Sequence, residues 1–288
     1  MLTIKHILFP TDFSERTCAA APFVEAMAKR FQAQVTLMSV APPLWYAAMG
    51  DVGTPVYVDP EELRADVQAR LERTLDREFA GLKVERVAEI GDPAEEITSY
   101  AHIQGVDLIM MPTHGYGPFR HLLLGSVTAK VLHDSQCPVW TAAHMQGPAG
   151  SEHVSPRAII CAVDGTPKSV PIMEWGADFA KQTGGQMRIV SVVPTLEGWP
   201  ERQLDRELAV ETVKDVRAQI TTLQREAGIE APLCVAMGNI SATVCEEARR
   251  HGANLVVIGR GLLHETLGRL RTHSYGIIRQ APCPVVSV

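Results

Sequence analysis

Residues 114–127 join an apolar segment to a segment with helical spacing through three glycines, Gly115, Gly117 and Gly125, and Ser126 follows the last of them. Glycines leave room for an anion to approach the backbone. The first N–H groups of a helix have no intrahelical partner and lie at its positive end, so they stabilise an anion placed there. The spacing therefore predicts a phosphate-binding loop that ends at a helix N-terminus.

Cationic and titratable side chains in and just after this stretch make it the most basic part of the chain: His114, Arg120, His121 and Lys130. The whole chain has a formal net charge of -6 over 288 residues. The local charge favours a polyanion, whereas the total charge argues against nucleic acid or an anionic membrane as the main partner. The loop histidines and Arg120 are expected to be either solvated or in contact with phosphate.

Two further residues are placed to complete a ligand site. Asp12 follows an apolar segment at residues 4–9, Val40 ends another at residues 34–40, and a third at residues 106–111 precedes the glycine-rich stretch. In an open parallel sheet, ligands bind at the carboxyl ends of the strands. Asp12 is therefore suited equally to accept hydrogen bonds from a ribose or an adenine amino group and to cap the helix that follows it. Val40 can offer backbone polar groups to a base.

Strand-like and amphipathic helix-like segments alternate along the chain, which predicts a parallel sheet with helices on both faces. In the first half, strands are expected near residues 4–9, 34–40, 84–89, 106–111 and 138–143. A helix is expected at residues 60–80, where apolar residues recur every four positions and Gly81 follows. The predicted fold class is α/β, with doubly wound, Rossmann-like parallel sheets.

The second half of the chain repeats the first in the same order. The segment around Asp12 returns 152 residues later around Asp164, and Cys137-Pro138-Val139 returns as Cys283-Pro284-Val285. Collinear self-similarity of this kind predicts two homologous domains. Residues 146–156 have the composition of a linker, so the expected domains are residues 1–145 and 157–288.

The composition excludes several other classes of site. The six cysteines lie far apart, and no cluster of residues has metal-ligand or redox spacing, so no metal site is expected. No Gly-x-Ser-x-Gly elbow is visible, and no catalytic residue is assigned. No apolar run approaches the roughly 18 residues of a membrane span, and no signal peptide is visible. These features favour a cytoplasmic location.

Five blocks in order resemble the universal stress protein family. They are Pro-Thr-Asp-Phe-Ser at 10–14, Gly-Asp-Pro-Ala-Glu-Glu-Ile at 91–97, Thr-His-Gly at 113–115, Leu-Leu-Leu-Gly-Ser-Val at 122–127 and Cys-Pro-Val at 137–139. The resemblance covers both halves and implies a tandem member whose domains have the fold of the adenine nucleotide alpha hydrolases.

The resemblance to the nucleotide-binding subgroup of this family implies a set of site residues. Asp12 and Val40 would hold adenosine, and the phosphates would lie against Gly115, Gly125, Ser126 and Val127.

This chain departs from the pattern of the subgroup in both halves. Pro112 stands where the subgroup has its first glycine, and proline has no N–H to offer a phosphate. In the second half, Arg271-Thr272 replaces Gly125-Ser126, so the second site is expected to be empty or altered.

Three functions are compatible with these residues. The first is a regulatory, stress-response protein that binds ATP, with Mg2+ arriving on the triphosphate, and that hydrolyses it slowly or not at all. The second is an enzyme that uses this fold for adenylyl transfer or ATP cleavage; such relatives resemble one another in a Ser-Gly-Gly-x-Asp-Ser loop, where this chain has Thr11-Asp12-Phe13-Ser14. The third is an interaction module with a vestigial nucleotide site.

The last strand of each half follows a Cys-Pro pair and should lie at a sheet edge, where unpaired backbone groups accept a partner strand. The resemblance implies that domains of the family dimerise through this strand. Strands 138–143 and 284–288 are therefore expected to pair antiparallel within one chain, as an internal pseudo-dimer. A homodimer of whole chains would then use another surface.

Overall fold

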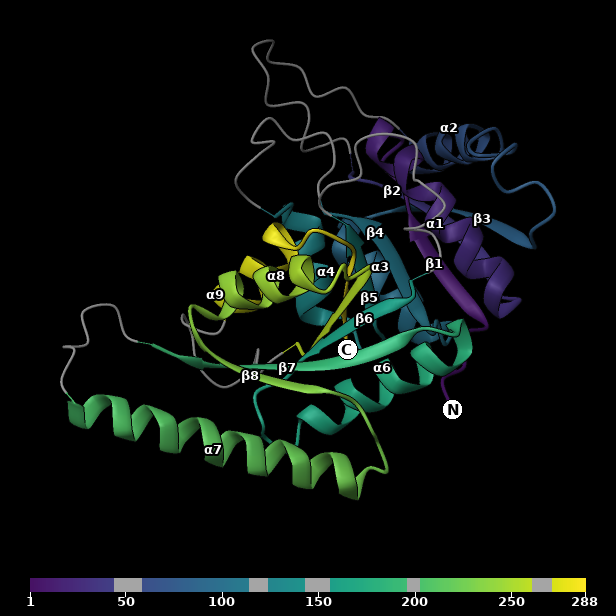
Figure 1. The fold of residues 1–288 in the computed structure, drawn as a ribbon. Coiled ribbons are helices and arrows are strands. Elements are labelled where there is room, and N and C mark those ends of the chain that lie inside the picture. The colour runs from purple at the N-terminus through teal and green to yellow at the C-terminus, as the bar shows by residue number, and fades with distance from the viewer. Residues whose placement is uncertain (44–58, 114–123, 143–155, 196–202, 261–270) are drawn as a thin grey trace, which may run out of the picture. The chain divides into compact units, whose positions relative to one another are not determined.

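The computed structural model describes residues 1–43, 59–113, 124–142, 156–195, 203–260 and 271–288 (Figure 1). Of residues 203–208, 271 and 272 it describes the backbone alone. The chain divides into two compact units, whose main parts are Thr3–Thr141 and Ser151–Val288. Both units alternate strand and helix, as the sequence predicted.

The helices and strands of the first unit are β1 (His6–Pro10), α1 (Glu15–Phe31), β2 (Gln34–Ala41), α2 (Pro60–Leu71), β3 (Val84–Ile90), α3 (Pro93–Ile103), β4 (Leu108–Pro112), α4 (Ser126–Asp134) and β5 (Val139–Ala142). Those of the second unit are β6 (Ala158–Ala162), α6 (Ser169–Thr183), β7 (Gln186–Pro194), α7 (Gln203–Glu226), β8 (Leu233–Gly238), α8 (Ile240–Arg250), β9 (Leu255–Ile258), α9 (Arg271–Gln280) and β10 (Val285–Ser287).

The two units have the same strand order and the same register. The order is β3-β2-β1-β4-β5 in the first unit and β8-β7-β6-β9-β10 in the second. Ile7 of β1 lies opposite Leu108 of β4, and the equivalent Ile159 lies opposite Leu255. The pairs of β1 with β2, β2 with β3, β6 with β7 and β7 with β8 are all parallel. The α/β prediction with parallel sheets is confirmed.

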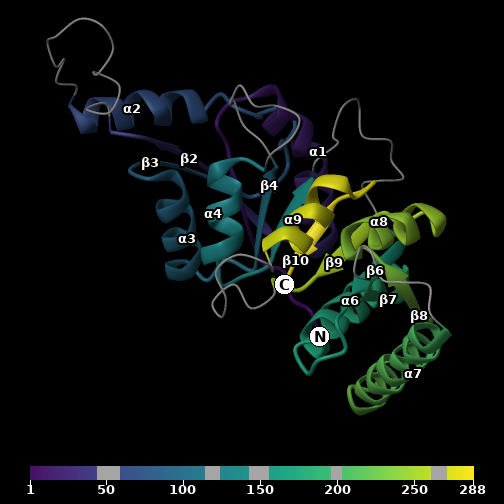
Figure 2. The same ribbon diagram turned by 90° about the vertical axis from the view of Figure 1, so that its left-hand side faces the viewer.

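Helices cover both faces of each sheet. In the second unit α6 and α7 lie on one face and α8 and α9 on the other (Figures 1 and 2). In the first unit α3 and α4 lie side by side. The apolar strands between the helices form the core, in which Phe9, Trp140 and Phe179 are among the largest fully buried side chains. Trp140 packs against Phe23 of α1, with ring centroids 5.3 Å apart.

Helix α2 is shorter than the expected helix at residues 60–80, because it ends at Leu71. Leu75 has a left-handed φ of +56°, which a continuing helix cannot contain. The Nε of Arg86 on β3 donates a hydrogen bond of 2.9 Å to the Leu71 carbonyl and so satisfies a group at the helix end. Leu71, Leu75 and Phe79 are nevertheless buried, as the four-residue spacing predicted.

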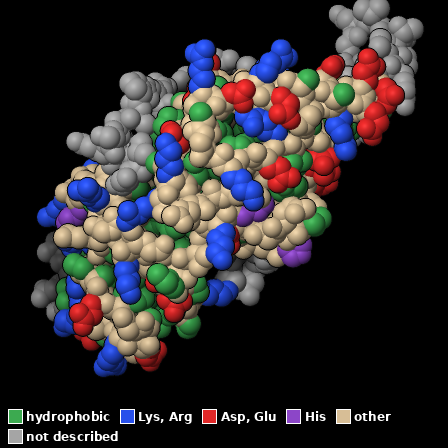
Figure 3. Space-filling view, turned by 90° about the vertical axis from the view of Figure 1, so that its right-hand side faces the viewer, with side chains coloured by type: hydrophobic (Ala, Val, Ile, Leu, Met, Phe, Trp, Pro, Cys, Tyr) green, Lys and Arg blue, Asp and Glu red, His purple; other side chains and the backbone are tan. Residues whose placement is uncertain are grey.

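The surface carries charges of both signs. On the face shown in Figure 3, Lys and Arg side chains occur together with Asp and Glu side chains. Among the described residues, none of the helices combines the length and the apolar character that a membrane crossing requires.

Candidate functional site

The carboxyl ends of β1, β2 and β4 lie at one edge of the first sheet. β1 pairs with β2 in the register Pro10↔Met38, so Asp12 and Val40 each lie two residues beyond that pair. β1 also pairs with β4, which ends at Pro112. The structure therefore brings Asp12, Val40 and the end of β4 to the same edge, where ligands of parallel sheets bind.

Asp12 is exposed and holds the first turn of the following helix through one of its two carboxylate oxygens. Its Oδ1 accepts hydrogen bonds of 3.0 Å from the Ser14 N–H and from the Thr17 hydroxyl. The N-cap of α1 is Ser14, not Asp12. Within the described residues Oδ2 of Asp12 has no hydrogen-bond partner, so this oxygen can accept a donor from a ligand.

Phe13 stands beside this carboxylate in a strained conformation. Its φ is +62°, which is uncommon for a residue other than glycine. The guanidinium carbon of Arg70 on α2 lies 4.0 Å from the centroid of the Phe13 ring, a cation–π contact. Arg70 therefore fixes the residue next to Asp12. The local sequence pattern contains no sign of this contact, because 57 positions separate Phe13 and Arg70.

The start of α4 presents backbone groups at the same edge. Gly125 is the N-cap, and no side chain caps the helix. The Gly125 N–H donates to the Thr113 carbonyl at 2.9 Å, and the Thr128 hydroxyl donates to the Pro112 carbonyl at 3.1 Å. These two bonds tie the start of α4 to the end of β4.

The N–H groups that remain at this helix start belong to the residues after Gly125. Within the described part of the chain, the N–H groups of Ser126 and Val127 have no hydrogen-bond partner. Ser126 is exposed, and Val127 is half-buried. The Gly125 N–H is therefore already used, whereas the N–H groups of Ser126 and Val127 are available to an acceptor at the helix start.

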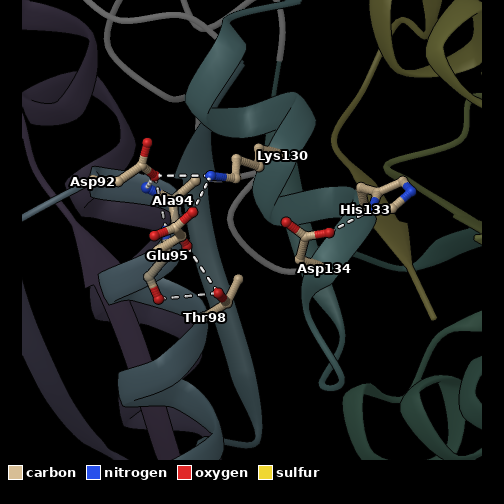
Figure 4. Close-up of polar contacts among 7 residues, drawn as sticks. All are labelled: Asp92, Ala94, Glu95, Thr98, Lys130, His133 and Asp134. Atoms are coloured by element: carbon tan, nitrogen blue, oxygen red, sulfur yellow. Dashed lines mark hydrogen bonds and ion pairs between the residues drawn. The ribbon is translucent and has the colours of Figure 1, made fainter.

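Lys130, a member of the basic stretch, is paired with two carboxylates in the structure. Its Nζ lies 2.8 Å from Oε1 of Glu95 and 3.3 Å from Oδ1 of Asp92 (Figure 4). Both carboxylates belong to the start of α3, which packs beside α4. Lys130 thus links the two helices, and its charge is compensated by two carboxylates.

Asp92 caps α3 and has its pKa lowered. Its Oδ1 accepts hydrogen bonds of 3.0 Å from the N–H groups of Ala94 and Glu95. The bond from the Glu95 N–H is the largest cause of the lowered pKa, and Lys130 adds to it. The Gly91-Asp92-Pro93-Ala94 block therefore has a structural role here, because it begins α3 and anchors α4.

Other predicted residues of the glycine-rich stretch lie outside the described residues: Gly115, His114, Gly117, Arg120 and His121. Their expected roles stay predictions. Val40 is half-buried in β2, opposite Glu89 of β3. Among the described residues no group of three or more His, Cys, Asp or Glu side chains is placed to hold a metal ion.

The second unit has a different arrangement at the equivalent edge. Oδ1 of Asp164 accepts from the Thr166 N–H at 3.0 Å, the Thr166 hydroxyl at 2.7 Å and the Ser169 hydroxyl at 2.9 Å. Partial burial raises the pKa of Asp164, but these hydrogen bonds outweigh it and the pKa is lowered. Asp164 thus stabilises the turn that follows it. Its carboxylate accepts hydrogen bonds from three protein donors, whereas that of Asp12 accepts from two.

The helix that corresponds to α4 begins differently as well. α9 starts at Arg271, where α4 has a glycine N-cap followed by Ser126. The side chains of Arg271 and Thr272 lie outside the described residues. A cavity of about 640 Å³ remains beside Asp164, lined also by Gly165 and by Gln219 of α7.

Both halves of the chain match a known family. Residues 3–142 and 156–288 each match the model of the Universal stress protein family. Universal stress protein MJ0577 of Methanocaldococcus jannaschii is 32% identical over 149 residues, which are 47% of this chain and 92% of that protein. Universal stress protein YxiE of Bacillus subtilis is 30% identical over 141 residues, which are 46% of this chain and 95% of that protein.

A solved structure of similar architecture covers the whole chain. A universal stress protein from Archaeoglobus fulgidus aligns with 100% of this chain and 97% of its own, with a TM-score of 0.68 and 21% sequence identity. At this identity the likeness concerns the fold.

Proposed function

Since the chain belongs to the universal stress protein family, with a family domain in each half, we propose that it binds an adenine nucleotide, ATP, at the carboxyl edge of the first sheet. Its role is regulatory, in a stress response, and turnover of the nucleotide is slow or absent. The second domain carries an altered site that binds nucleotide weakly or not at all.

The start of α4 is the observation that carries this proposal. The N–H groups of Ser126 and Val127 are unpaired within the described residues, and the glycine before them leaves space for an anion. Oδ2 of Asp12, at the same edge, is available for a ribose hydroxyl. A phosphate at the helix start and a sugar at the carboxylate match the two polar parts of one nucleotide.

Magnesium would arrive with the triphosphate. Because the described residues supply no cluster of ligands for it, the ion would be held by phosphate oxygens and water. The protein's own contribution would be to bind and orient the nucleotide.

Two other functions remain as alternatives. An enzyme of this fold that transfers adenylyl groups or cleaves ATP would convert the nucleotide. An interaction module with a vestigial site would bind no nucleotide, which the missing N–H of Pro112 favours.

The test is native mass spectrometry of the purified chain, followed by incubation with Mg-ATP and chromatography of the nucleotides. Binding with unchanged ATP over hours supports the proposal. Rapid formation of AMP or ADP would identify an enzyme, and a chain that carries and takes up no nucleotide would identify an interaction module.

We also propose that the two domains, at residues 1–145 and 157–288, form an internal pseudo-dimer through β5 and β10. These strands come last in the order of their own units, and Val139 and Val286 are both buried. A Val286→Asp change should then lower the thermal stability of a single chain. If Val286→Asp instead only converted a dimer into a well-folded monomer in light scattering, the strands would pair between chains.

A cytoplasmic location stays a prediction.

A further inference from the structure

A second cavity lies in the second unit, at the amino ends of β6 and β7, away from the carboxyl ends where Asp164 lies. Its volume is about 670 Å³, which is in the range of small-molecule sites. Ala158 of β6 and Met187 of β7 give it apolar walls, and Arg188, Glu230 and His251 line it with polar groups.

The equivalent place in the first unit is filled by a hydrogen-bonded cluster. His6, Thr36 and Tyr100 occupy the positions of Ala158, Arg188 and Glu247. The Thr36 hydroxyl lies 2.8 Å from His6 Nε2 and 3.5 Å from the Tyr100 hydroxyl.

In the second unit this cluster has been replaced by a small residue and two charged ones. Alanine at position 158 leaves the space that the His6 ring takes up in the first unit. The exchange therefore accounts for the opening at this point of the cavity wall.

Arg188 is a half-buried cation with no direct partner. It makes no hydrogen bond or ion pair with any residue that the structure describes. A guanidinium group in partly apolar surroundings is stabilised by an anion that it can contact through two N–H groups. The cavity in front of Arg188 has room for such an anion.

Glu247 lies behind the cavity wall and is incompletely satisfied. Glu247 is only 7% exposed, and its Oε2 has no hydrogen-bond partner among the described residues. His251, which lines the cavity, has its Nε2 3.3 Å from this oxygen. As an imidazolium, which donates from both ring nitrogens, His251 can donate to Glu247 from Nε2 and to an anionic ligand from Nδ1.

We propose that this cavity binds a small organic carboxylate. The carboxylate contacts Arg188, His251 donates to it, and its apolar part lies against Ala158 and Met187. One negative charge matches Arg188, the one Arg or Lys among the described residues that line the cavity. A dianion such as phosphate would meet Glu230, which also lines the cavity, and the nearby Glu247. The ligand thus belongs to a different chemical class from the nucleotide proposed for the first unit.

The experiment is a titration of the full chain with hexanoate, followed in 1H–15N NMR spectra. Saturable shifts are expected at residues 158–160 and 186–188. In Arg188→Thr, which introduces the first unit's residue, hexanoate should bind at least about tenfold more weakly, because a charge-assisted bond is lost. Arg225→Thr, at an exposed position on α7, is the matched control and should leave the affinity unchanged.

A second variant separates lost binding from lost folding. Ala158→His fills the opening and leaves Arg188 in place, so it should abolish hexanoate binding while the melting temperature is kept. Unsaturable shifts in the wild type, or equal affinities of wild type and Arg188→Thr, would overturn the proposal. Competition with inorganic phosphate is a further test. If phosphate displaced hexanoate at a concentration below the Kd of hexanoate, the site would be a general oxyanion site and the proposal would be overturned.

Discussion

The two halves of the chain place different polar residues on the same strand register. Leu37 pairs with Arg86 in the first sheet, and the equivalent Ile189 pairs with Leu233 in the second. At the carboxyl edge, however, Asp12 has two protein donors and Asp164 has three.

The opposite edge of the two sheets differs too. Thr36 belongs to a closed hydrogen-bonded cluster, whereas its counterpart Arg188 faces a cavity. The apolar strands therefore form the same scaffold in both halves. The polar residues at the strand ends decide separately what each half can bind.

The largest expected effect is that of Gly125→Asp on nucleotide binding. The new carboxylate would occupy the space in front of the Ser126 and Val127 N–H groups and repel phosphate. The affinity for ATP in calorimetry should fall by more than about 1.4 kcal/mol, a factor of ten. The φ of Gly125 is −58°, which other residues adopt, so the fold should be kept.

Val210→Asp is the matched control for this change, since it adds the same charge at a side chain that is 55% exposed on α7. Its affinity for ATP should equal that of the wild type. Unchanged affinity in Gly125→Asp would remove the start of α4 from the site.

The paired variants Asp12→Asn and Asp164→Asn compare the two edges directly. Asn keeps Oδ1 as an acceptor but removes the charge. Asp12→Asn should weaken ATP binding by about 1.5 kcal/mol, the low end for a bond to a charged group, because the site is exposed. Asp164→Asn should leave ATP binding unchanged and lower the melting temperature, because its charged form accepts three hydrogen bonds. Loss of ATP binding in Asp164→Asn alone would reverse the assignment of the halves.

The link between α3 and α4 predicts a pH dependence of stability. The pKa of Asp92 lies below its ordinary 3.8 in the folded chain. Its contribution is therefore present above pH 3.8 and disappears as the pH falls through the lowered pKa. In Asp92→Asn, which keeps a capping side chain, the free energy of unfolding should depend less on pH in this acidic range.

Because the side chain of Asp92 is half exposed, the free energies of unfolding of wild type and Asp92→Asn should differ by less than about 1 kcal/mol at pH 7. Parallel urea titrations at pH 7 and pH 3.5 measure it, and identical pH dependence in both proteins would exclude the link.

The last pair of variants concerns the ends of α1 and α6. Both helices end in a left-handed residue, which is Gln32 with φ 53° in the first unit and Gly184 with φ 68° in the second. Gln32→Gly should stabilise the chain by about 0.5 kcal/mol, because the strain relieved slightly exceeds the added freedom of the unfolded chain. Gly184→Ala should destabilise it by about 1 kcal/mol. Thermal unfolding of both variants checks these signs, and a stabilising Gly184→Ala would contradict the comparison.

The sequence predicted the strands because buried parallel strands are runs of apolar residues, and the repeat predicted their recurrence in the second half. It predicted the length of α2 wrongly. The helix ends where Arg86 of β3 binds the Leu71 carbonyl, and Leu75 then adopts a left-handed conformation. Neither feature is visible in the spacing of the apolar residues. The partners of Lys130 are not visible in the local pattern either, because these two carboxylates lie more than 30 positions earlier in the chain. The local sequence pattern thus predicted where strands and helices lie. The contacts of the charged side chains could not be predicted in this way, because they form between elements that are distant in the sequence.

The central claim, that the first half carries the nucleotide site and the second does not, is tested most directly by the stoichiometry of binding. Calorimetric titration of the full chain with Mg-ATP should give one site per chain, which is absent in Gly125→Asp and retained in Asp164→Asn. Two sites per chain would show that Arg271-Thr272 substitutes for the glycine and serine of the first half. No site at all would show that neither helix start binds ATP.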